Sequence, residues 1–409
     1  MGAWGENVAV TALLPLDEAR ARVVAAVAAP LEAEAVEVGD APGRVLAEDV
    51  LAAADVPPFA NSAMDGFAVL AGPAGRALRV VDESRAGRPA RRPVGEGEAI
   101  RISTGAPLPA GAMAVVPVEH TAERDGAVVL EREAPPHANV RDAGEDLSAG
   151  AVVVRRGTVL GPPEVAAAVA AGRAEVRCAR RPRVAILATG DELAPPGAPL
   201  APGQIHDSNA VALAALAARE GTQMVREGIV PDDRAGTEEA LKRALEAADV
   251  VVVSGGVSVG PHDHVKPALA ALGVEERFWR VALKPGKPAW FGARGSTLVF
   301  GLPGNPVSAV VCFLLFVRPG LRALQGAEPL PAPATALAAE PIRRSPERAQ
   351  AVRVALDTGP DGVLAARPTG PQGSHLLTSL LGADALALVP VGEGDVAAGE
   401  PVAVERIAP

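Results

Sequence analysis

The sequence contains no tyrosine, and aromatic residues make up only 2% of its 409 residues. Platforms on which nucleic-acid bases stack are therefore scarce. The formal net charge is −10 and the basic residues form no long run, which disfavours a protein that neutralises many DNA phosphates. We expect no nucleic-acid partner, and any bound phosphate should belong to a small ligand.

Cysteines and long apolar segments are also few. Cys178 and Cys312 lie far apart, which matches neither a disulfide framework nor a CxxC metal site, so a reducing cytoplasm is the expected compartment. The longest strongly apolar stretch, 307–317, is shorter than the roughly 20 residues that span a bilayer, and it predicts a buried helix. Residues 1–10 contain no basic region followed by an apolar segment, so no secretory signal and no membrane association are expected.

Lysine is confined to one part of the chain. Arginine occurs almost throughout, whereas the lysines are Lys242, Lys266, Lys284 and Lys287. Because lysine presents a compact, mobile charge, this clustering favours a phosphate or oxyanion site, with chance as the alternative.

The hydrophobic patterning predicts several α/β and β domains. Helix-period positions over 13–30 and 162–172 predict two helices that pack together, and short strand patterns occur between them. From 181, apolar strands alternate with helices, which predicts a doubly wound α/β domain with a parallel sheet. The Pro-rich segment 327–341 predicts a boundary before a small β-barrel or sandwich.

A chain of 409 residues has room for about two to four domains, and these patterns predict four. They are a discontinuous helical and linker domain (1–56 and 139–180), an inserted strand-rich module (57–138), an α/β domain (181–326) and a C-terminal β domain (327–409).

Two loops that follow predicted strands contain residues suited to charged ligands. Ligands of open α/β sheets bind at the carboxyl ends of strands. Segment 189–192 (TGDE) presents a hydroxyl and two carboxylates there, with a capping turn as the alternative. The glycines of 254–260 (SGGVSVG) let backbone N–H groups surround an anion. This loop lacks a Walker ending and dinucleotide spacing, which disfavours a nucleoside triphosphatase or a dehydrogenase.

An acidic residue after the glycine-rich loop is suited to bind a cation together with a phosphate group. Asp263 can hold Mg²⁺, because that ion needs only one or two carboxylates when phosphate supplies the other ligands. His262 and His264 form a His-x-His pair without a third ligand nearby in the sequence, which disfavours a metal role for them.

Further candidate loops combine rigidity with polar groups. In 301–308 (GLPGNPVS), Asn305 is expected to cap the buried helix and Pro306 to be its first residue. The alternative to a ligand site is a rigid capped turn with a structural role alone. The loop 284–287 (KPGK) adds two cations on a stiff backbone. Asp65 and Thr104 occupy tight turns of the strand module, where a turn signal is the alternative to a ligand contact.

Together these loops resemble those of the molybdopterin molybdenumtransferases, which include the MoeA proteins and the E domain of gephyrin. The resemblance runs in order from about residue 10 to the C-terminus. It rests on PPFANSAMDGFA (57–68), RISTGAPLPAGAMAVV (101–116), NVRDAGEDLSAG (139–150), ATGDEL (188–193), SGGVSVGPHDHVK (254–266), LKPGKPAWFG (283–292), GLPGNPVSAV (301–310) and PQGSHLLTSLLGAD (371–384).

The resemblance implies a fold and an activity. The fold has four domains in an elongated homodimer, and its α/β domain is of the molybdopterin-binding type found in the adenylyltransferases. The activity is Mg²⁺-dependent: adenylylated molybdopterin and molybdate give the molybdenum cofactor and AMP. A molybdopterin adenylyltransferase is an implied partner.

The resemblance also implies roles for individual residues. Asp65, Thr104, Glu192 and Asp263 carry over as catalytic residues, with Glu192 and Asp263 as Mg²⁺ ligands. Asp65 and Thr104 are expected to act across the dimer, because the family's cleft joins the strand module of one subunit to the α/β domain of the other. The implied substrate contacts are Ser254, Gly255, Gly256, Ser258, Lys266, Lys284, Lys287, Pro303, Gly304, Asn305, Pro306, Arg353, Ser374 and one of Asp232 and Asp233.

The sequence departs from the family pattern at four positions. Phe67 and His264 stand where tyrosine is usual, and Ala60 and Met113 stand where aspartate is common. None of these changes removes an implied catalytic residue. Two alternatives stay open: the adenylyltransferase itself, and a non-catalytic scaffold on the same fold. The full-length match argues against the first, and the retained acids argue against the second.

Overall fold

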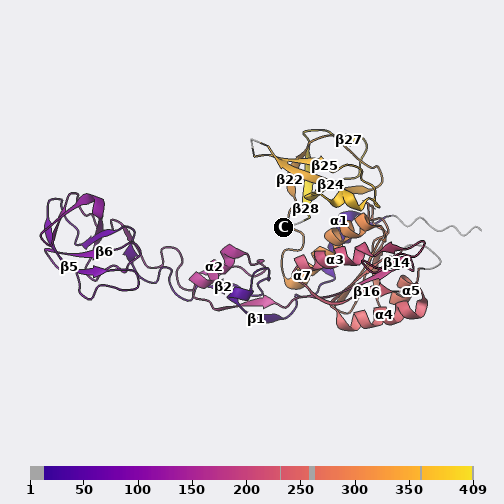
Figure 1. Cartoon of the computed structure of the whole chain (residues 1–409), viewed down its shortest axis with the longest axis horizontal. Helices are drawn as coiled ribbons and strands as arrows, with labels where there is room; N and C mark the ends of the chain where they lie inside the picture. Colours follow the sequence, from indigo (N-terminus) through magenta and orange to yellow (C-terminus); the bar gives the residue numbers. More distant parts are fainter. Residues whose placement is uncertain (1–12, 231, 258–262, 360–361, 408–409) are drawn as a thin grey trace, which may run out of the picture. The chain divides into compact units, whose positions relative to one another are not determined.

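The computed structural model describes residues 13–230, 232–257, 263–359 and 362–407, which form two compact units (Figure 1). The main unit comprises Met1–Glu34, Gly43–Ala47 and Ala179–Pro409. The inserted unit comprises Ala35–Pro42 and Glu48–Cys178.

A six-stranded sheet forms the centre of the main unit. Its strand order is β16-β13-β17-β21-β20-β18, and β16, β13, β17 and β21 are parallel, as the sequence predicts. Strand β20 is antiparallel to both neighbours, and residues 295–296 form the hairpin turn that joins it to β21. The strands are β13 (Arg183–Thr189), β16 (Gln223–Val230), β17 (Val250–Ser254), β18 (Glu275–Trp279), β20 (Trp290–Arg294) and β21 (Thr297–Leu302).

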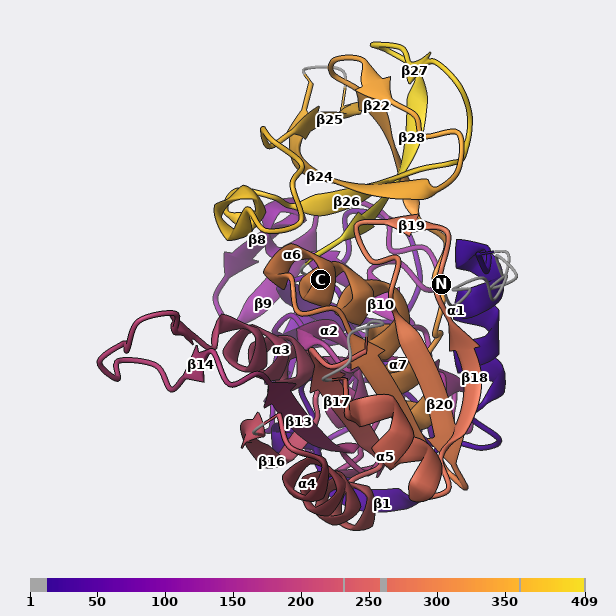
Figure 2. The same ribbon diagram turned by 90° about the vertical axis from the view of Figure 1, so that its right-hand side faces the viewer.

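Helices cover both faces of this sheet, because successive strand side chains point to opposite sides. Val184 and Ile186 pack on one side, with α1, α3, α6 and α7, whereas Ala185 and Leu187 pack on the other side with α4 and α5. Figure 2 shows α4 and α5 together. The helices are α1 (Leu16–Ala25), α3 (Ser208–Arg219), α4 (Arg234–Ala247), α5 (Val265–Ala271), α6 (Pro306–Cys312) and α7 (Arg318–Gln325).

The two helices expected to pack together lie in different units. Leu16, Ala19 and Val23 of α1 belong to the core of the α/β sheet. Helix α2 (Pro162–Ala170) contacts β11 (Val152–Val154) in the inserted unit. The expected packing is therefore wrong, because the apolar side of α1 is covered by α7 and the residues before it.

A continuous apolar helix, Pro306–Gln325, crosses the core of the main unit. Its length and composition would allow a membrane span, but 89% of its most apolar window is buried in the protein, which confirms a buried helix. Between α6 and α7 it contains a π-helical turn, Phe313–Val317. Pro319 has no backbone N–H, so it cannot donate to the carbonyl oxygen of the residue four positions before it, as a regular helix requires. This accounts for the irregular turn before Pro319.

The C-terminal strands of the main unit close into a five-stranded barrel, as the sequence predicts. The closing pair is β24 with β26. Strand β22 lies inside the segment 327–341 that was expected to be a boundary, because its small alternating side chains pack into the barrel. The strands are β22 (Ala334–Ala338), β24 (Ala349–Thr358), β25 (Leu364–Pro368), β26 (Ala385–Val389) and β28 (Pro401–Arg406).

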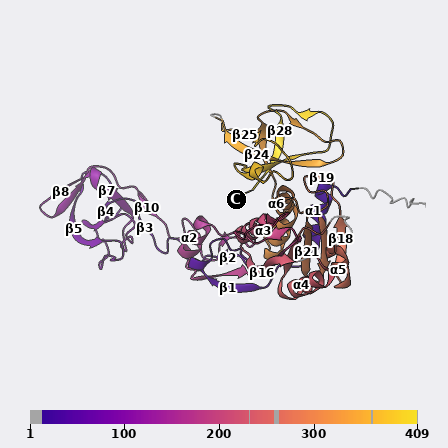
Figure 3. The ribbon, with the colours of Figure 1, turned by 45° about the vertical axis from the view of Figure 1, so that its right-hand side comes forward.

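The barrel is joined to the α/β sheet by a strand pair and by ionic contacts, among others, and Figure 3 shows β19 beneath the barrel. Strand β19 (Leu283–Lys284) pairs in parallel with β24. The Glu405 carboxylate of β28 accepts hydrogen bonds from Arg20 of α1 at 2.8 Å and from Arg318 of α7 at 2.6 Å. These three side chains are largely buried, so the barrel is attached by a desolvated ionic contact.

The inserted unit contains a second six-stranded sheet, in the order β7-β4-β6-β5-β9-β8. Phe67 is fully buried in its core, and the Arg101 guanidinium lies 4.8 Å from the centre of that ring. The strands are β4 (Gly66–Val69), β5 (Ala77–Ser84), β6 (Glu98–Ile102), β7 (Ala114–Pro117), β8 (Thr121–Arg124) and β9 (Ala127–Leu130).

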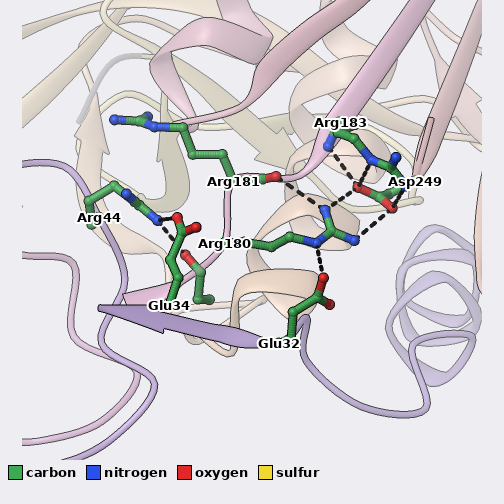
Figure 4. Close-up of polar contacts among 8 residues, drawn as sticks. Glu32, Glu34, Arg44, Arg180, Arg181, Arg183 and Asp249 are labelled. Atoms are coloured by element: carbon green, nitrogen blue, oxygen red, sulfur yellow. Dashed lines mark hydrogen bonds and ion pairs between the residues drawn. The ribbon is translucent and has the colours of Figure 1, made fainter. Parts of the chain in front are cut away.

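An ion-pair network lies at the amino ends of β13 and β17 (Figure 4). Arg180 donates to the two carboxylate oxygens of Asp249 at 2.6 and 2.9 Å and to Glu32 at 2.6 Å. Arg183 donates to Asp249 from its backbone N–H at 2.8 Å and from its side chain at 3.0 Å. Burial favours a raised pKa for Asp249, but the hydrogen bonds from Arg180 and Arg183 outweigh it and hold that pKa well below its usual range.

Replacing Asp249 with Asn should lower the free energy of unfolding at pH 7 by about 2–3 kcal/mol, because Arg180 keeps its burial but loses its counter-charge. The carboxylate's pKa is lower in the folded than in the unfolded chain, so its contribution is complete above about pH 4 and is lost as the pH falls further. Urea denaturation of both chains should therefore give a difference that shrinks below pH 4.

The matched control is Asp357→Asn, which removes an ion pair with Arg367 in which both side chains are about 60% exposed. It should cost less than about 1 kcal/mol. Equal costs for the two variants, or a difference that grows in acid, would contradict this account of Asp249.

Candidate functional site

Predicted ligand loops of the main unit meet at the carboxyl edge of its sheet. Strands β13, β17 and β21 are neighbours, and they end at Thr189, Ser254 and Leu302. A cavity of about 110 Å³ lies at this edge. The residues predicted as ligand contacts that line it are Thr189, Glu192, Ser254, Gly304 and Pro306.

The glycine-rich loop after β17 requires its first two glycines. Gly255 and Gly256 have φ values of +92° and +64°, which residues other than glycine rarely adopt. A Cβ atom on Gly255 would lie 2.7 Å from the carbonyl oxygen of Thr189, and one on Gly256 would lie 2.4 Å from Cγ2 of Val265. The loop therefore packs directly on the end of β13. Ser258 and His262 lie outside the described residues.

Asn209 at the start of α3 connects two of these loops. Its side-chain amide donates to Oγ of Ser254 at 2.9 Å and to the carbonyl oxygen of Gly304 at 2.8 Å. Asp207 caps α3 by accepting from the N–H of Ala210 at 3.0 Å. Sequence reasoning missed both residues, although Asp-Ser-Asn before an apolar helix pattern is an N-cap signature.

Acidic residues gather beside the cavity. Asp232 donates its backbone N–H to the carboxylate of Asp191 at 3.1 Å. Burial raises the pKa of Asp232, and the charges of Asp191 and Glu192 raise it further. Asp233 instead caps α4, because its carboxylate accepts from the N–H of Gly236 at 2.7 Å. The charges of the neighbouring acids therefore act on Asp232, whereas Asp233 is used as a helix cap.

The donor set was tested for a metal site. Among the described residues, no three His, Cys, Asp or Glu side chains converge on one point. Mg²⁺ typically uses one or two carboxylates together with substrate phosphates and water. The like charges of Asp191 and Glu192 around Asp232 suit a cation, so this donor set fits Mg²⁺ that is bound with a phosphate ligand and does not fit a metal held by protein alone.

The loop with Lys284 and Lys287 packs on the buried helix. Both lysines are exposed. Gly286 has φ of +125°, and a Cβ atom there would lie 2.8 Å from Sγ of Cys312 and 2.9 Å from Leu283. Burial raises the pKa of the Cys312 thiol above its usual range, so this cysteine is a neutral packing group beneath the cationic loop.

The N-terminus of α6 contacts the barrel, and here a prediction about Asn305 is wrong. Asn305 occupies the N-cap position, but its side chain makes no capping hydrogen bond. Its amide donates instead to Oγ of Ser374 at 3.1 Å, and the carbonyl oxygen of Ser374 accepts from the N–H of Val307 at 3.2 Å. Pro306 is the first helical residue, as predicted. Ser374 thus takes the place of a side-chain cap.

Arg353 lies behind the loop that carries Ser374. Its side chain is fully buried, and it donates to Oγ of Ser379 at 3.2 Å and to the carbonyl oxygen of Pro371 at 3.2 Å. No carboxylate among the described residues faces it, and its Nη1 has no hydrogen-bond partner there. Burial lowers its pKa. The structure therefore places Arg353 as a support of the Ser374 loop.

In the inserted unit, Asp65 and Thr104 are in direct contact. A carboxylate oxygen of Asp65 accepts from the backbone N–H of Thr104 at 2.8 Å, and both residues are exposed. A Cβ atom on the next residue, Gly66, would lie 2.0 Å from the carbonyl oxygen of Val116. The turn therefore requires glycine at that position and presents the two polar side chains together.

Three family models match the chain. They are the MoeA N-terminal region (domain I and II) over residues 14–172, the probable molybdopterin binding domain over 185–323 and the MoeA C-terminal region (domain IV) over 335–407.

Individual relatives match over nearly their whole length. A molybdopterin molybdenumtransferase of Haemophilus influenzae is 36% identical over 398 residues, which cover 96% of this chain and 98% of the relative. Molybdopterin molybdenumtransferase 2 of Mycobacterium tuberculosis is 38% identical over 393 residues, which cover 92% and 96%. The crystal structure of the molybdopterin biosynthesis moeA protein of Pyrococcus horikoshii has a TM-score of 0.83 at 30% identity, covering 96% of this chain and 99% of that chain.

Replacing Gly256 with Ala should lower the free energy of unfolding at least about 1 kcal/mol more than replacing Gly273 with Ala, as overpacking predicts. Both glycines have left-handed backbones, with φ of +64° and +78°, but a Cβ atom on Gly273 has nothing within 4 Å. Urea denaturation of both variants separates the steric clash from the backbone strain. Equal losses would show that the loop does not pack as described.

Proposed function

Because the chain belongs to the molybdopterin molybdenumtransferase family, we propose that it inserts molybdenum from molybdate into adenylylated molybdopterin and releases AMP. The observation that carries this proposal is the carboxyl edge of the main sheet. There Ser254 at the start of the glycine-rich loop, the acid Glu192 and the first residue of α6, Pro306, border one cavity. A phosphoanhydride and an oxyanion need this combination of N–H donors, a cation site and fixed positive charge.

Glu192, Asp263 and Asp232 are the proposed acids for the adenylylated end of the substrate. We assign the role to Asp232 because Asp233 is used as a helix cap. When Mg²⁺ is bound with the substrate phosphates, it neutralises their charge and so assists the departure of AMP. Backbone N–H groups of the glycine-rich loop, with Ser254, Gly255, Gly256 and Ser258, are the proposed contacts of the phosphates themselves.

Molybdate is the second substrate, and rigid cationic loops are its proposed site. Lys284 and Lys287 supply charge on a loop that is packed against α6. Residues 303–306 supply a rigid turn at the start of that helix, and Ser374 fixes this turn through Asn305. Arg353 acts in this proposal by holding the Ser374 loop in place.

The remaining parts of the proposal concern assembly and location. Asp65 and Thr104 form one polar surface of the inserted unit, and they act on substrate held by the main unit of a second subunit in a homodimer. The working compartment is the cytoplasm, and a molybdopterin adenylyltransferase supplies the substrate.

Purified chain incubated with adenylylated molybdopterin, molybdate and Mg²⁺ should release AMP, and Asp65→Asn should lower the rate about 100-fold or more. Asparagine keeps an oxygen that accepts from Thr104, so the loop stays in place while the charge is lost. Asp125→Asn, an exposed aspartate of the same unit, is the matched control and should leave the rate unchanged. No AMP from the unmodified chain, or equal rates for the two variants, would contradict the proposal.

Mixing Asp65→Asn subunits with Asp263→Asn subunits should restore about a quarter of the unmodified rate. In a symmetric dimer, half of the random pairs are mixed, and each mixed pair has one site with both aspartates if they act across subunits. The measurement is AMP release after the two variants are mixed and allowed to exchange. A mixture no faster than its parents would place both aspartates in one subunit.

A further inference from the structure

Asn209 lies between two segments that follow different strands of the main sheet. It is the second residue of α3, and its side-chain amide donates to Oγ of Ser254 at 2.9 Å and to the carbonyl oxygen of Gly304 at 2.8 Å. Ser254 is the last residue of β17, and Gly304 comes shortly after the end of β21. One side chain therefore bridges the carboxyl ends of two neighbouring parallel strands.

The chemistry of the two acceptors fixes the orientation of this amide. The carbonyl oxygen of Gly304 can only accept a hydrogen bond, so the amide nitrogen of Asn209 must face it. This nitrogen carries a second hydrogen, which it donates to Ser254. Both donors of the amide are thus used on the protein, and the bridge depends on an N–H donor to each side.

The bridge also orients the hydroxyl group of Ser254. A serine hydroxyl has a single proton to donate, and Asn209 occupies a lone pair of its oxygen. Oγ of Ser254 makes no other hydrogen bond within the ranges that the structure describes. Ser254 is only 2% exposed and borders the cavity of about 110 Å³ at the carboxyl edge. Its proton is therefore available to an acceptor atom of a ligand in that cavity.

Helix α3 gives the bridge a rigid base. Asp207 caps the helix, and Ala210, Leu213 and Ala217 are buried in the core of the main unit. The helix contacts β13, β16 and α6 (Figure 2). Side chains on packed helices are held more precisely than side chains on loops. The short side chain of Asn209 therefore sets the separation of the two segments and does not merely follow their motion.

We propose that Asn209 is a positioning residue, which holds the sites of the organic substrate and of molybdate at one fixed separation. This inference rests on the proposed function, in which Ser254 contacts the phosphates and the turn 303–306 contacts molybdate. The rate of reaction between two bound groups depends steeply on their distance and alignment, so a change in spacing lowers the rate even where each group still binds. Asn209 acts through Ser254 and Gly304 and takes no part in the chemistry itself.

Gln325 offers a matched control at the other end of the same helix. Its side-chain amide is buried and also donates twice, to the carbonyl oxygens of Glu220 at 3.0 Å and Leu321 at 3.2 Å. Glu220 is the C-cap of α3, so this amide ties the end of α3 to α7. Replacing either amide side chain with alanine removes the same kind of bridge, but Gln325 lies away from the carboxyl edge.

The first test measures binding to the full chain by titration calorimetry, with molybdate and AMP as probes and without Mg²⁺. Two anions held close together repel each other, so AMP should raise the Kd for molybdate about threefold or more in the unmodified chain. Asn209→Ala should bring this factor close to one, because the two segments can then separate, while the Kd of each probe alone stays near that of the unmodified chain. Gln325→Ala should keep the full factor.

The second test measures AMP release from adenylylated molybdopterin in the presence of molybdate and Mg²⁺. Asn209→Ala should lower kcat about tenfold or more with little change in KM, because spacing is lost and binding is kept. Asn209→Asp keeps the shape of the side chain but removes its N–H donors, and it should lower kcat at least as far. Gln325→Ala should lower the melting temperature to a similar extent as Asn209→Ala and leave kcat unchanged.

The same molybdate factor in the unmodified chain and in Asn209→Ala, or no effect of AMP in the unmodified chain, would overturn the proposal. Equal losses of kcat in Asn209→Ala and Gln325→Ala, or a raised KM at unchanged kcat in Asn209→Ala, would overturn it as well. Calorimetry needs no turnover. An Asn209-dependent factor in a chain that releases no AMP would therefore support the spacing role and reject the enzymatic function.

Discussion

Burial of the helix Pro306–Gln325 is the constraint on which the rest of the main unit depends. Its first residue borders the cavity at the carboxyl edge, and the N–H of Val307 is satisfied by Ser374 of the barrel. Farther along, Cys312 packs under Gly286 of the cationic loop, and Arg318 pairs with Glu405 of β28. One apolar helix therefore fixes the positions of two candidate loops and of the barrel.

Charged residues are arranged differently at the two ends of the main sheet. At the amino ends of the strands, Arg180 and Arg183 are neutralised by Asp249, so that the network stabilises the fold. At the carboxyl edge, Arg280 and Lys266 lie over the indole of Trp279, and the charge of Asp263 acts on Lys266. The loops that are proposed to bind the substrates follow the strands at this second end of the sheet.

Much of this organisation is predictable from the sequence because it depends on local patterns. Apolar runs and helix periodicity locate the parallel strands and the buried helix, and the family motifs locate the loops at the carboxyl edge. Two predictions are wrong where nonlocal packing decides. Helix α1 joins the α/β core, and the Asn305 side chain bonds Ser374 from a distant segment. Asn209 was missed because its role arises from hydrogen bonds to Ser254 and Gly304, which lie far away in the sequence.

The central claim is that both substrates bind around the N-terminus of Pro306–Gln325 at the carboxyl edge of the sheet. The most direct measurement is a crystal structure of the chain with AMP and molybdate, in which anomalous scattering locates molybdenum. The account predicts molybdenum within contact distance of the loops 284–287 or 303–306, with the AMP phosphate at the glycine-rich loop. Molybdenum bound at the amino ends of the strands, beside Arg44 and Arg181, would contradict it.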